Sequence, residues 1–251
     1  MTNAKPLPVF LTGASRGIGA ATARHFARNG HPLALVARGI DAIEELAREI
    51  NESGGKAVAI PCDVGDAQSV ARAVERAVKE LGEIGIVINN AGIIEPIATI
   101  VDVDLDAWSH TLDVNLSGPI YVLHHAVPHL PRGGVVINVT SGAAENPSYG
   151  RSAYCASKAG LMIATRIFAV EEGEKRGITV IGFSPGLVDT DMNALNRAKR
   201  MGSAGNVNLA ELRPPTESAQ IIDYLCSPAA KDLSGTIVSA RDPAFRQRVG
   251  V

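Results

Sequence analysis

Short apolar runs alternate with longer amphipathic segments along most of the chain. The runs hold three to five residues and contain few polar positions, which is typical of strands that are buried on both faces of a sheet. Glycine, proline and other turn residues border many of them. We expect strands at Val9–Leu11, Leu33–Ala37, Ala57–Ile60, Ile84–Ile88, Val135–Val139, Thr179–Phe183 and Thr236–Val238.

The segments between these runs carry apolar residues at helical spacing. The predicted helices are Ile18–Asn29, Asp41–Ser53, Val70–Leu81, Ala107–Leu130, Ser152–Glu172 and Thr216–Cys226. Strands that alternate with helices in this way indicate an α/β protein with a parallel sheet covered on both faces, and right-handed crossovers make such a sheet doubly wound. Residues 189–215 break the rhythm because they are poor in branched apolar residues, and we expect them to form a substrate lid.

The composition excludes several classes of protein. Of the 251 residues, 46% are hydrophobic and 20% are charged, and the formal net charge is −2. The apolar content argues against disorder, and the absence of a basic excess argues against nucleic-acid binding. No stretch has the ~18 consecutive apolar residues of a membrane helix, and the first apolar run is too short for a signal peptide. The widely spaced Cys62, Cys155 and Cys226 predict reduced thiols in a cytoplasmic protein.

A glycine-rich turn follows the first predicted strand and leads into the first predicted helix. Its sequence is Thr12-Gly13-Ala14-Ser15-Arg16-Gly17-Ile18-Gly19, with the spacing G-x-x-x-G-x-G. Glycines let a pyrophosphate approach backbone N–H groups at the positive end of a helix. The place between strand and helix favours such a loop over an ordinary glycine-rich turn. The candidate cofactor-binding residues here are Gly13, Ser15, Arg16, Gly17, Ile18 and Gly19.

The residues after the second predicted strand bear on the choice between NAD(H) and NADP(H). Sites for NAD(H) usually place an Asp or Glu there, to bind the ribose 2′-hydroxyl. Here the strand ends in Arg38-Gly39, and Arg38 together with Arg16 would suit a 2′-phosphate. NADP(H) is therefore favoured over NAD(H). The alternatives are that Arg38 faces solvent, and that the nearby Asp41 serves NAD(H).

A tyrosine and a lysine stand four residues apart at the start of a predicted helix. Tyr154 and Lys158 therefore share one face, and a nearby cation lowers the pKa of a phenol toward the range that general acid–base catalysis needs. Ser141 lies just beyond the predicted strand Val135–Val139, where ligands bind in sheets of this kind. Taken alone, such a pair is more often a pair of surface neighbours.

These motifs occur together with several others, and the chain resembles the short-chain dehydrogenase/reductase family over nearly all of its length. The matches, in family order and at family spacing, are Thr12-Gly13-x-x-x-Gly17-x-Gly19, Asp63-Val64, Asn89-Asn90-Ala91-Gly92, Asn115, Ser141, Tyr154-x-x-x-Lys158 and Pro185-Gly186-x-x-x-Thr190. The resemblance implies a single Rossmann-type domain over residues 1–251. It also implies a seven-stranded parallel sheet in the order 3-2-1-4-5-6-7.

The resemblance implies four catalytic residues. Tyr154 would be the general acid in ketone reduction or the base in alcohol oxidation, and Lys158 would lower its pKa and bind the nicotinamide ribose. Ser141 would stabilise charge that develops on the substrate oxygen. Asn115 would kink its helix and hold a water that relays protons to Lys158.

The resemblance extends the cofactor site to the ends of later strands. Asp63 and Val64 would flank the adenine, and the segment from Asn89 to Gly92 would form the wall beside the ribose. The nicotinamide end would be held by the segment that begins at Pro185. The further candidate cofactor-binding residues are Arg38, Asp63, Val64, Asn90, Ala91, Gly92, Tyr154, Lys158, Pro185, Gly186, Val188 and Thr190.

Finer resemblances concern the substrate end. The segments 90–96 and 185–192 and the pair Ala107-Trp108 look like the sepiapterin-reductase and benzil-reductase branch, whose members reduce dicarbonyls or pterin side-chain ketones. The common D-G-G segment of the family is not kept near the C-terminus, where Asp242 is either a substrate contact or a surface carboxylate. No metal site is predicted, because His124, His125 and His129 have no acidic or thiol partner at ligand spacing.

The sequence therefore predicts an NADPH-dependent oxidoreductase that reduces a ketone or dicarbonyl to a secondary alcohol. The alternatives are an NAD-dependent alcohol or sugar dehydrogenase and a non-catalytic NADP(H)-binding sensor. The partners expected are a small carbonyl or alcohol substrate and further copies of the chain, as a homodimer or homotetramer, with no nucleic acid and no membrane. The substrate itself, the direction of reaction in the cell and the role of the divergent C-terminus are not settled by the sequence.

Overall fold

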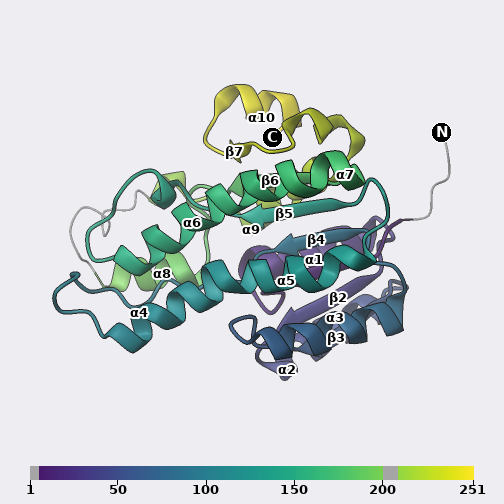
Figure 1. Ribbon diagram of the computed structural model, residues 1–251, viewed down its shortest axis with the longest axis horizontal. Coiled ribbons are helices and arrows are strands. Elements are labelled where there is room, and N and C mark those ends of the chain that lie inside the picture. The colour runs from purple at the N-terminus through teal and green to yellow at the C-terminus, as the bar shows by residue number, and fades with distance from the viewer. Residues whose placement is uncertain (1–5, 200–208) are drawn as a thin grey trace.

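Seven parallel strands form one sheet in the order β3-β2-β1-β4-β5-β6-β7, as predicted (Figure 1). The computed structural model describes residues 6–199 and 209–251. The parallel register pairs Leu11 of β1 with Leu35 of β2 on one side and with Ile88 of β4 on the other. The strands are β1 Val9–Thr12, β2 Leu33–Ala37, β3 Ala57–Pro61, β4 Ile86–Asn89, β5 Val135–Val139, β6 Thr179–Ser184 and β7 Ile237–Ser239.

Helices cover both faces of this sheet. One layer holds α1, α2 and α9, and the other holds α3, α5 and α6 (Figure 1). The helices are α1 Gly17–Arg28, α2 Ile40–Glu52, α3 Ala67–Leu81, α4 Leu105–Leu112, α5 Gly118–Ala126, α6 Ser152–Phe168, α7 Glu174–Arg176, α8 Asp191–Ala198, α9 Pro215–Cys226 and α10 Pro243–Val249. Each crossover returns the chain to the same edge, so the carboxyl ends of the strands lie together.

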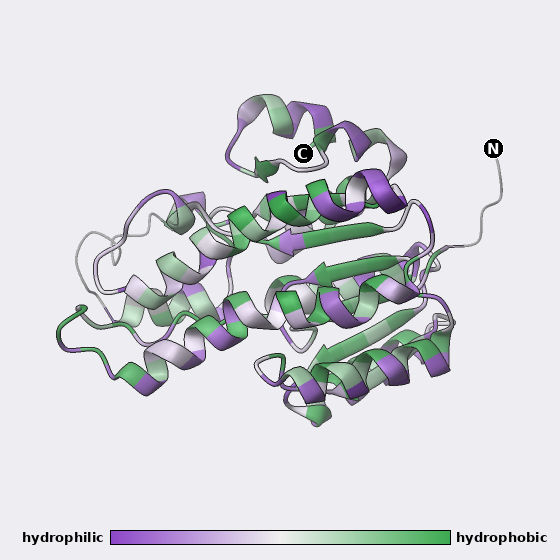
Figure 2. Cartoon of the chain, viewed as in Figure 1, coloured by the Kyte–Doolittle hydropathy of each residue, from purple (hydrophilic) through white to green (hydrophobic). Residues whose placement is uncertain are grey.

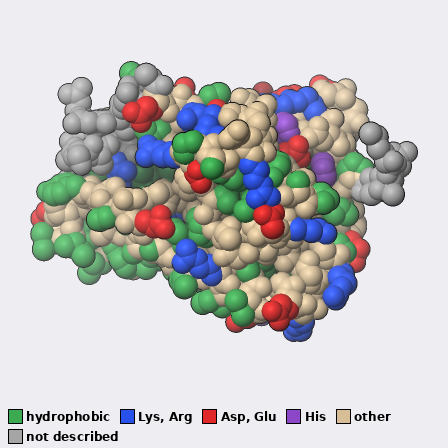
Figure 3. All heavy atoms as spheres, turned by 90° about the horizontal axis from the view of Figure 1, so that it is seen from above, with side chains coloured by type: hydrophobic (Ala, Val, Ile, Leu, Met, Phe, Trp, Pro, Cys, Tyr) green, Lys and Arg blue, Asp and Glu red, His purple; other side chains and the backbone are tan. Residues whose placement is uncertain are grey.

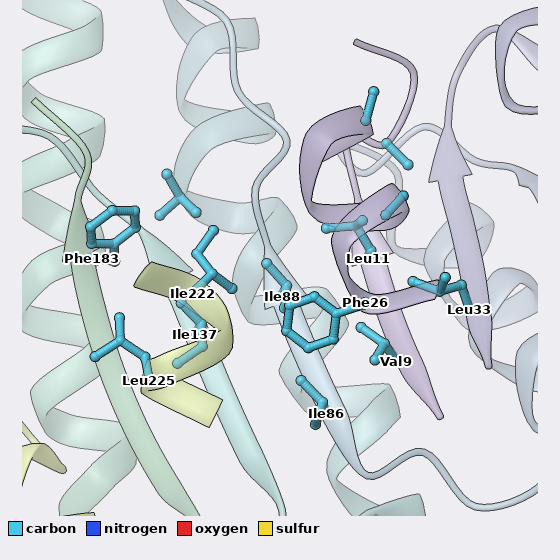
Figure 4. Close-up of a cluster of buried hydrophobic side chains, with 14 of the residues drawn as sticks. Val9, Leu11, Phe26, Leu33, Ile86, Ile88, Ile137, Phe183, Ile222 and Leu225 are labelled. Carbon is cyan, nitrogen blue, oxygen red and sulfur yellow. The ribbon is translucent and has the colours of Figure 1, made fainter. Parts of the chain in front are cut away.

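The core divides into two clusters because successive residues of a strand point to opposite faces. Val9 and Leu11 of β1 face one cluster, together with Phe26 of α1, whereas Phe10 faces the other. Figure 4 shows the first cluster, in which Ile222 and Leu225 of α9 pack beside Ile137 of β5. Full burial of an apolar side chain of this size stabilises the fold by about 1.5–3 kcal/mol. The two helix layers therefore fix the sheet from both sides.

The long helix predicted for Ala107–Leu130 is interrupted. The structure has α4, then a π-helical segment η1 at Asp113–Ser117, then α5, and it ends in a 3₁₀ turn η2 at Val127–His129. The helix predicted for Ser152–Glu172 changes in a similar way, from α6 to a π segment η4 at Ala169–Gly173 and then α7. Side chains that bond across the fold at Asn115, described below, account for the first break.

Two helices were not predicted. The first is α8, which lies within the predicted lid at 189–215, where the sequence showed only an irregular stretch. Residues 200–208 of that stretch, including Met201, lie outside the described residues, so the lid stays a prediction. The second is α10, whose N-cap is Asp242: its Oδ1 accepts a hydrogen bond from the Ala244 N–H at 2.9 Å. Asp242 is exposed and serves as a helix cap.

The helical run Ser152–Arg176 contains a long apolar stretch. By length and composition alone it is apolar enough to cross a membrane, and 39% of its most apolar window is buried in the protein. Lys158, Leu161 and Thr165 lie on its buried side. Its outer side exposes Ile163, Ile167 and Val170. The ribbon of α6 carries several hydrophobic stretches in the hydropathy colouring (Figure 2). The run is therefore a core helix with a second apolar face that the described residues do not cover.

The C-terminal segment is tied down by ion pairs. Arg248 Nη2 lies 2.6 Å from Asp232 Oδ1, and Arg246 Nη1 lies 2.5 Å from Glu217 Oε1, which also receives Arg213 at 3.1 Å. Seen from above, basic and acidic side chains are interspersed over this part of the molecule (Figure 3).

The three cysteines are free thiols.

Candidate active site

The glycine loop after β1 leaves the start of α1 open. Its N-cap, Arg16, makes no side-chain capping bond, and the first turn of α1 has no acidic residue. The helix therefore presents unpaired N–H groups and its positive dipole end to the space in front of it. A group at this place must be an anion to be bound well, which is what the phosphates of a dinucleotide supply.

The glycines are required by close packing. A methyl group on Gly13, which has a φ of +65°, would lie 2.8 Å from the Cα of Ala91. A methyl group on Gly19 would overlap the carbonyl oxygen of Gly13. Side chains at these two positions would therefore push the loop away from β4 and from its own helix.

Thr12 and Asn90 hold the ends of β1 and β4 together. Thr12 Oγ1 accepts hydrogen bonds from the N–H groups of Asn90 at 3.0 Å and Ala91 at 3.1 Å. In return, Asn90 Nδ2 donates to the carbonyl oxygens of Thr12 at 3.0 Å and Gly13 at 3.1 Å. The side chain of Asn90 is thus a structural support for the glycine loop, as well as a residue on the cavity beside it.

The adenine end of the site lies at the tips of β2 and β3. Arg38 is exposed after β2, and Val64 is buried after β3. Asp63 Oδ1 accepts a hydrogen bond from the Gly65 N–H at 3.0 Å, which shapes the turn before α3. Arg16 does not point toward Arg38 here, because its guanidinium pairs with Asp191 at 3.1 Å.

Tyr154 and Lys158 lie buried on one face of α6. The Lys158 Nζ is 5.9 Å from the centre of the Tyr154 ring and donates a hydrogen bond to the carbonyl oxygen of Val139 at 2.8 Å. Burial lowers the pKa of Lys158 to about 8. Burial also raises the pKa of Tyr154, while a hydrogen bond with Ser141 and the charge of Arg151 act in the opposite direction. At neutral pH the pair therefore consists of a neutral phenol beside a mainly cationic amine.

Asn115 clamps the segment after β4 to the helix layer. Its Oδ1 accepts from the Ile93 N–H at 2.8 Å, and its Nδ2 donates to the Ile93 carbonyl at 2.8 Å and to Ser157 Oγ at 3.1 Å. These bonds lie within the π segment η1, so the helix departs from α geometry at the position where the resemblance implied a kink. Gly92 leaves room beside them, since a methyl group there would lie 3.5 Å from Lys158 Nζ.

A buried chain of amides links β4, β5 and α6. Asn89 Nδ2 donates to Asn138 Oδ1 at 2.9 Å, and Asn138 Nδ2 donates to Thr165 Oγ1 at 2.9 Å. Thr165 in turn donates to the Leu161 carbonyl at 2.7 Å. The chain fixes the distance of α6, which carries Tyr154 and Lys158, from the two central strands.

The segment from Pro185 to Thr190 closes the site on the side of β6. Its backbone pairs with the residue before α9: the Asp189 N–H donates to the Arg213 carbonyl at 2.9 Å, and the Arg213 N–H donates to the Leu187 carbonyl at 3.0 Å. Gly186 has a φ of +73°, and the Arg241 side chain lies against it. Thr190 reaches the glycine loop, where its Cγ2 would lie 3.1 Å from a methyl group on Gly17.

One cavity of about 860 Å³ joins these parts. Most of the predicted site residues line it: Gly13, Ser15, Arg16, Gly17, Ile18, Arg38, Asp63, Val64, Asn90, Ala91, Gly92, Tyr154, Lys158, Pro185 and Thr190. The predicted site residues that are not among those lining it are Gly19, Asn115, Ser141, Gly186 and Val188. The Ser141 hydroxyl accepts from the Ala143 N–H at 3.2 Å and opens the 3₁₀ turn η3 at Gly142–Ala144.

Sequence reasoning missed several residues on the cavity. Cys62, Val139 and Thr140 all lie at or next to strand ends, so the rule that ligands bind at this edge would have found them. Asp191 and Met192 also line the cavity; they lie in the predicted lid, although the helix α8 that carries them was not predicted. Within residues 6–199 and 209–251, no three His, Cys, Asp or Glu side chains gather as metal ligands would.

The residues present fit a dinucleotide. The N-terminus of α1 is open to an anion, and the cavity is large enough for a dinucleotide. The loop glycines suit one as well, because a side chain on them would displace the loop. In addition, Thr140 Oγ1 is buried on the cavity wall and has no hydrogen-bond partner among the described residues. An orphaned polar atom of this kind is expected where a ligand completes the site.

The chain belongs to the short-chain dehydrogenase family, whose model matches residues 8–201. It is 35% identical to cis-4-hydroxycyclohexanecarboxylate dehydrogenase of Sinomonas cyclohexanicum, over 91% of this chain and 92% of that one. Among solved structures, it is similar to a blue fluorescent protein from a metagenomic library in complex with NADPH, with a TM-score of 0.86, 32% identity, and coverage of 95% and 97%. A short-chain dehydrogenase of Burkholderia cenocepacia in complex with NADP gives a TM-score of 0.83 at 31% identity, with coverage of 94% and 96%.

Family membership confirms that the chain is an NAD(P)-dependent oxidoreductase of this class, acting on a small molecule. It does not distinguish the sepiapterin-reductase and benzil-reductase branch, which stays a prediction. The roles of individual residues and the preference for NADP(H) are taken up below.

The buried Lys158 leads to a prediction about stability. Its pKa of about 8 in the folded chain compares with 10.5 ordinarily, so the unfolded chain binds more protons between these pH values and the free energy of unfolding rises with pH there. Below pH 8 the full cost, about 3 kcal/mol, is present. We expect Lys158→Met to be about 1–3 kcal/mol more stable at pH 7, after the loss of the bond to Val139, with the gain shrinking toward pH 10.5.

Urea unfolding of the free protein at pH 7 and pH 10 measures this gain. Lys79→Met, in the last turn of α3, is the matched control and should leave stability nearly unchanged. A Lys158→Met variant less stable than the parent at pH 7 would show that the ammonium group is held by interactions that outweigh its burial.

Proposed function

We propose that the protein reduces a ketone or dicarbonyl to a secondary alcohol with NADPH. The observation that carries the proposal is the buried Tyr154–Lys158 pair at one end of a cavity whose other end is the glycine loop and Arg38. In this proposal Tyr154 is the proton donor to a substrate carbonyl that meets the nicotinamide of a bound dinucleotide. NADPH, when bound, supplies the hydride.

Tyr154 is the general acid in this proposal. Because burial raises its pKa, the phenol is protonated at neutral pH and can pass its proton to the carbonyl oxygen as that oxygen becomes an alkoxide. The Ser141 hydroxyl lies beside the phenol and stabilises charge on the same oxygen. The Lys158 cation stabilises the phenolate that remains. Asn115 acts as a positioning residue through Ser157 and Ile93.

The preference for NADPH rests on charge at the adenine end. No acid follows β2 directly, and Arg38 stands exposed there beside the cavity. A guanidinium binds a phosphate with charge-assisted hydrogen bonds, whereas a ribose 2′-hydroxyl gains little from it. The two similar solved structures named above contain NADPH and NADP, which supports the same choice.

Oxidation of a secondary alcohol is the second candidate. It is favoured by the name of the Sinomonas cyclohexanicum relative, which is a dehydrogenase of a hydroxycyclohexane carboxylate. The same residues would serve, with Tyr154 as the base. Turnover of NADPH with ketones, α-diketones, acyl thioesters and pterins, compared with turnover of NAD⁺ and NADP⁺ with alcohols, separates the two directions. Absence of any turnover would favour the NADP(H)-binding sensor.

Removal of the phenol tests the acid. We expect Tyr154→Phe to lower kcat by about 10²–10⁴-fold, the usual contribution of general acid–base catalysis, with NADPH affinity changed by less than about twofold. Steady-state kinetics and calorimetric titration with NADPH give the two quantities. Tyr149→Phe, a nearby exposed tyrosine, is the control and should keep normal turnover. Full activity of Tyr154→Phe would reject the mechanism.

Reversal of charge at Arg38 tests the cofactor. We expect Arg38→Asp to lower the ratio of NADPH to NADH catalytic efficiency by about 10- to 150-fold, because it removes a charge-assisted bond and adds an acid for the ribose hydroxyl. Arg48→Asp, on the exposed side of α2, makes the same charge change away from the cavity. If both variants kept the parent ratio, Arg38 would be a solvent-facing residue.

Assembly through the outer faces of α5 and α6 is also proposed, as a homodimer or homotetramer in the cytoplasm. Ile120 of α5 exposes 40% of its surface, Ile163 and Ile167 of α6 expose 53% and 50%, and Val170 of the following π segment η4 exposes 76%. Exposed large apolar side chains of this kind are characteristic of a contact between subunits.

Light scattering measures this assembly. We expect a mass at least twice that of the chain, and a lower mass for Ile167→Asp, because a carboxylate cannot be buried without a partner in an apolar contact. Gln68→Asp, on the exposed side of α3, should keep the parent mass. A monomeric parent protein would contradict the proposal.

A further inference from the structure

Arg16 of the glycine loop is held by Asp191 of α8. The Arg16 Nη1 and Asp191 Oδ2 atoms are 3.1 Å apart, and the two side chains are 76% and 71% exposed. Among the described residues, Asp191 is the acid with which Arg16 pairs. Thr190, the residue before α8, also lies close to Gly17 of the glycine loop. The first turn of α8 therefore lies over the glycine loop.

The order of the strands places Arg38 and Asp191 on opposite sides of Arg16. Arg38 follows β2, which neighbours β1 on one side, whereas Asp191 follows β6, which lies beyond β4 and β5 on the other side. Arg16 follows β1 and stands between them. A guanidinium turned toward Asp191 is therefore turned away from the ribose phosphate region at the tip of β2.

We propose that Asp191 weakens the preference for NADP(H) by competing with its 2′-phosphate for Arg16. The inference rests on the proposed use of NADPH and names a residue that weakens that preference. A carboxylate and a phosphate are both anions that a guanidinium binds through the same N–H groups. Binding of the phosphorylated cofactor must therefore break the Arg16–Asp191 pair, while binding of NAD(H) leaves it in place.

The size of the effect follows from the exposure of the pair. Ion pairs between exposed side chains are weak, and the loss of one changes an equilibrium by about two- to fivefold. Asp191 is therefore expected to tune the preference for the 2′-phosphate, and Arg38 is expected to create it.

The test uses two nucleotides that lack the nicotinamide, so that any direct contact of α8 with that ring plays no part. We measure binding of adenosine 2′,5′-bisphosphate and of 5′-AMP to the whole protein by calorimetry. Asp191→Asn should bind the bisphosphate about two- to fivefold more tightly than the parent and bind 5′-AMP equally well. Asp106→Asn removes an exposed carboxylate of α4 that does not line the cavity, and should change neither affinity.

Arg16→Met supplies the coupling test. In that background Asp191→Asn should no longer alter binding of the bisphosphate, because the competed group is absent. Unchanged or weaker binding of the bisphosphate by Asp191→Asn would overturn the inference. It would indicate that Arg16 binds the Asp191 carboxylate and the 2′-phosphate at the same time, so that the substitution removes a support for Arg16. An equal gain for both nucleotides would overturn it too. A parent protein that fails to bind either nucleotide would reject the proposed function itself, independently of Asp191.

Discussion

The close packing of the glycine loop against the end of β4 is the constraint on which the site depends. Thr12 and Asn90 bind each other's backbone there, and Gly13 leaves no room for a side chain. This contact fixes where α1 begins and therefore where its unpaired N–H groups point. It also fixes the next residues along the chain, Ala91 and Gly92. Gly92 in turn lies beside Asn115 and Lys158. The phosphate end and the catalytic end of the cavity are thus set by one junction between two neighbouring strands.

The catalytic end contains a cation in an apolar setting. Lys158 is buried, and no carboxylate pairs with it among the described residues: its Nζ is bound to a backbone oxygen and lies beside the Tyr154 ring. Burial of an ammonium group opposes folding. In the proposed mechanism, the same lack of a counter-ion leaves its charge available to the phenolate that Tyr154 would form, since a neighbouring carboxylate would cancel it. In that mechanism the position gives up stability of the fold for electrostatic support of Tyr154.

Much of the fold could be predicted from the sequence, because the signals are local. Strands β2 and β5 have the predicted ends, since continuous apolar runs bordered by turn residues determine them. The break at Asn115 could not be predicted, because it depends on bonds to Ile93 and Ser157 that lie far away in the chain. Helix α10 was missed although its local signals are present: Asp242 as N-cap, Pro243 in the first turn, and Gly250 at the end.

The candidate site divides in the same way. Motif residues such as Gly13, Tyr154 and Lys158 gather on one cavity because each follows or faces a strand end, which the sequence pattern marks. The pairing of Arg16 with Asp191 joins the glycine loop to the first turn of α8, 175 residues away, and no periodicity or spacing indicates it. Side-chain direction on exposed loops is therefore the part of the site that only the three-dimensional arrangement determines.

The amide chain from Asn89 through Asn138 to Thr165 restricts how this protein can change over time. Replacement of one member by an aliphatic residue would leave a buried partner unpaired, at a cost of about 1–3 kcal/mol. Replacement of two members that bond each other costs less, because both ends of their shared bond disappear at once. A single substitution in this hydrogen-bonded chain is therefore unfavourable, whereas a paired substitution of two bonded members is tolerated. The three positions are expected to change together, which keeps α6, with Tyr154 and Lys158, in place.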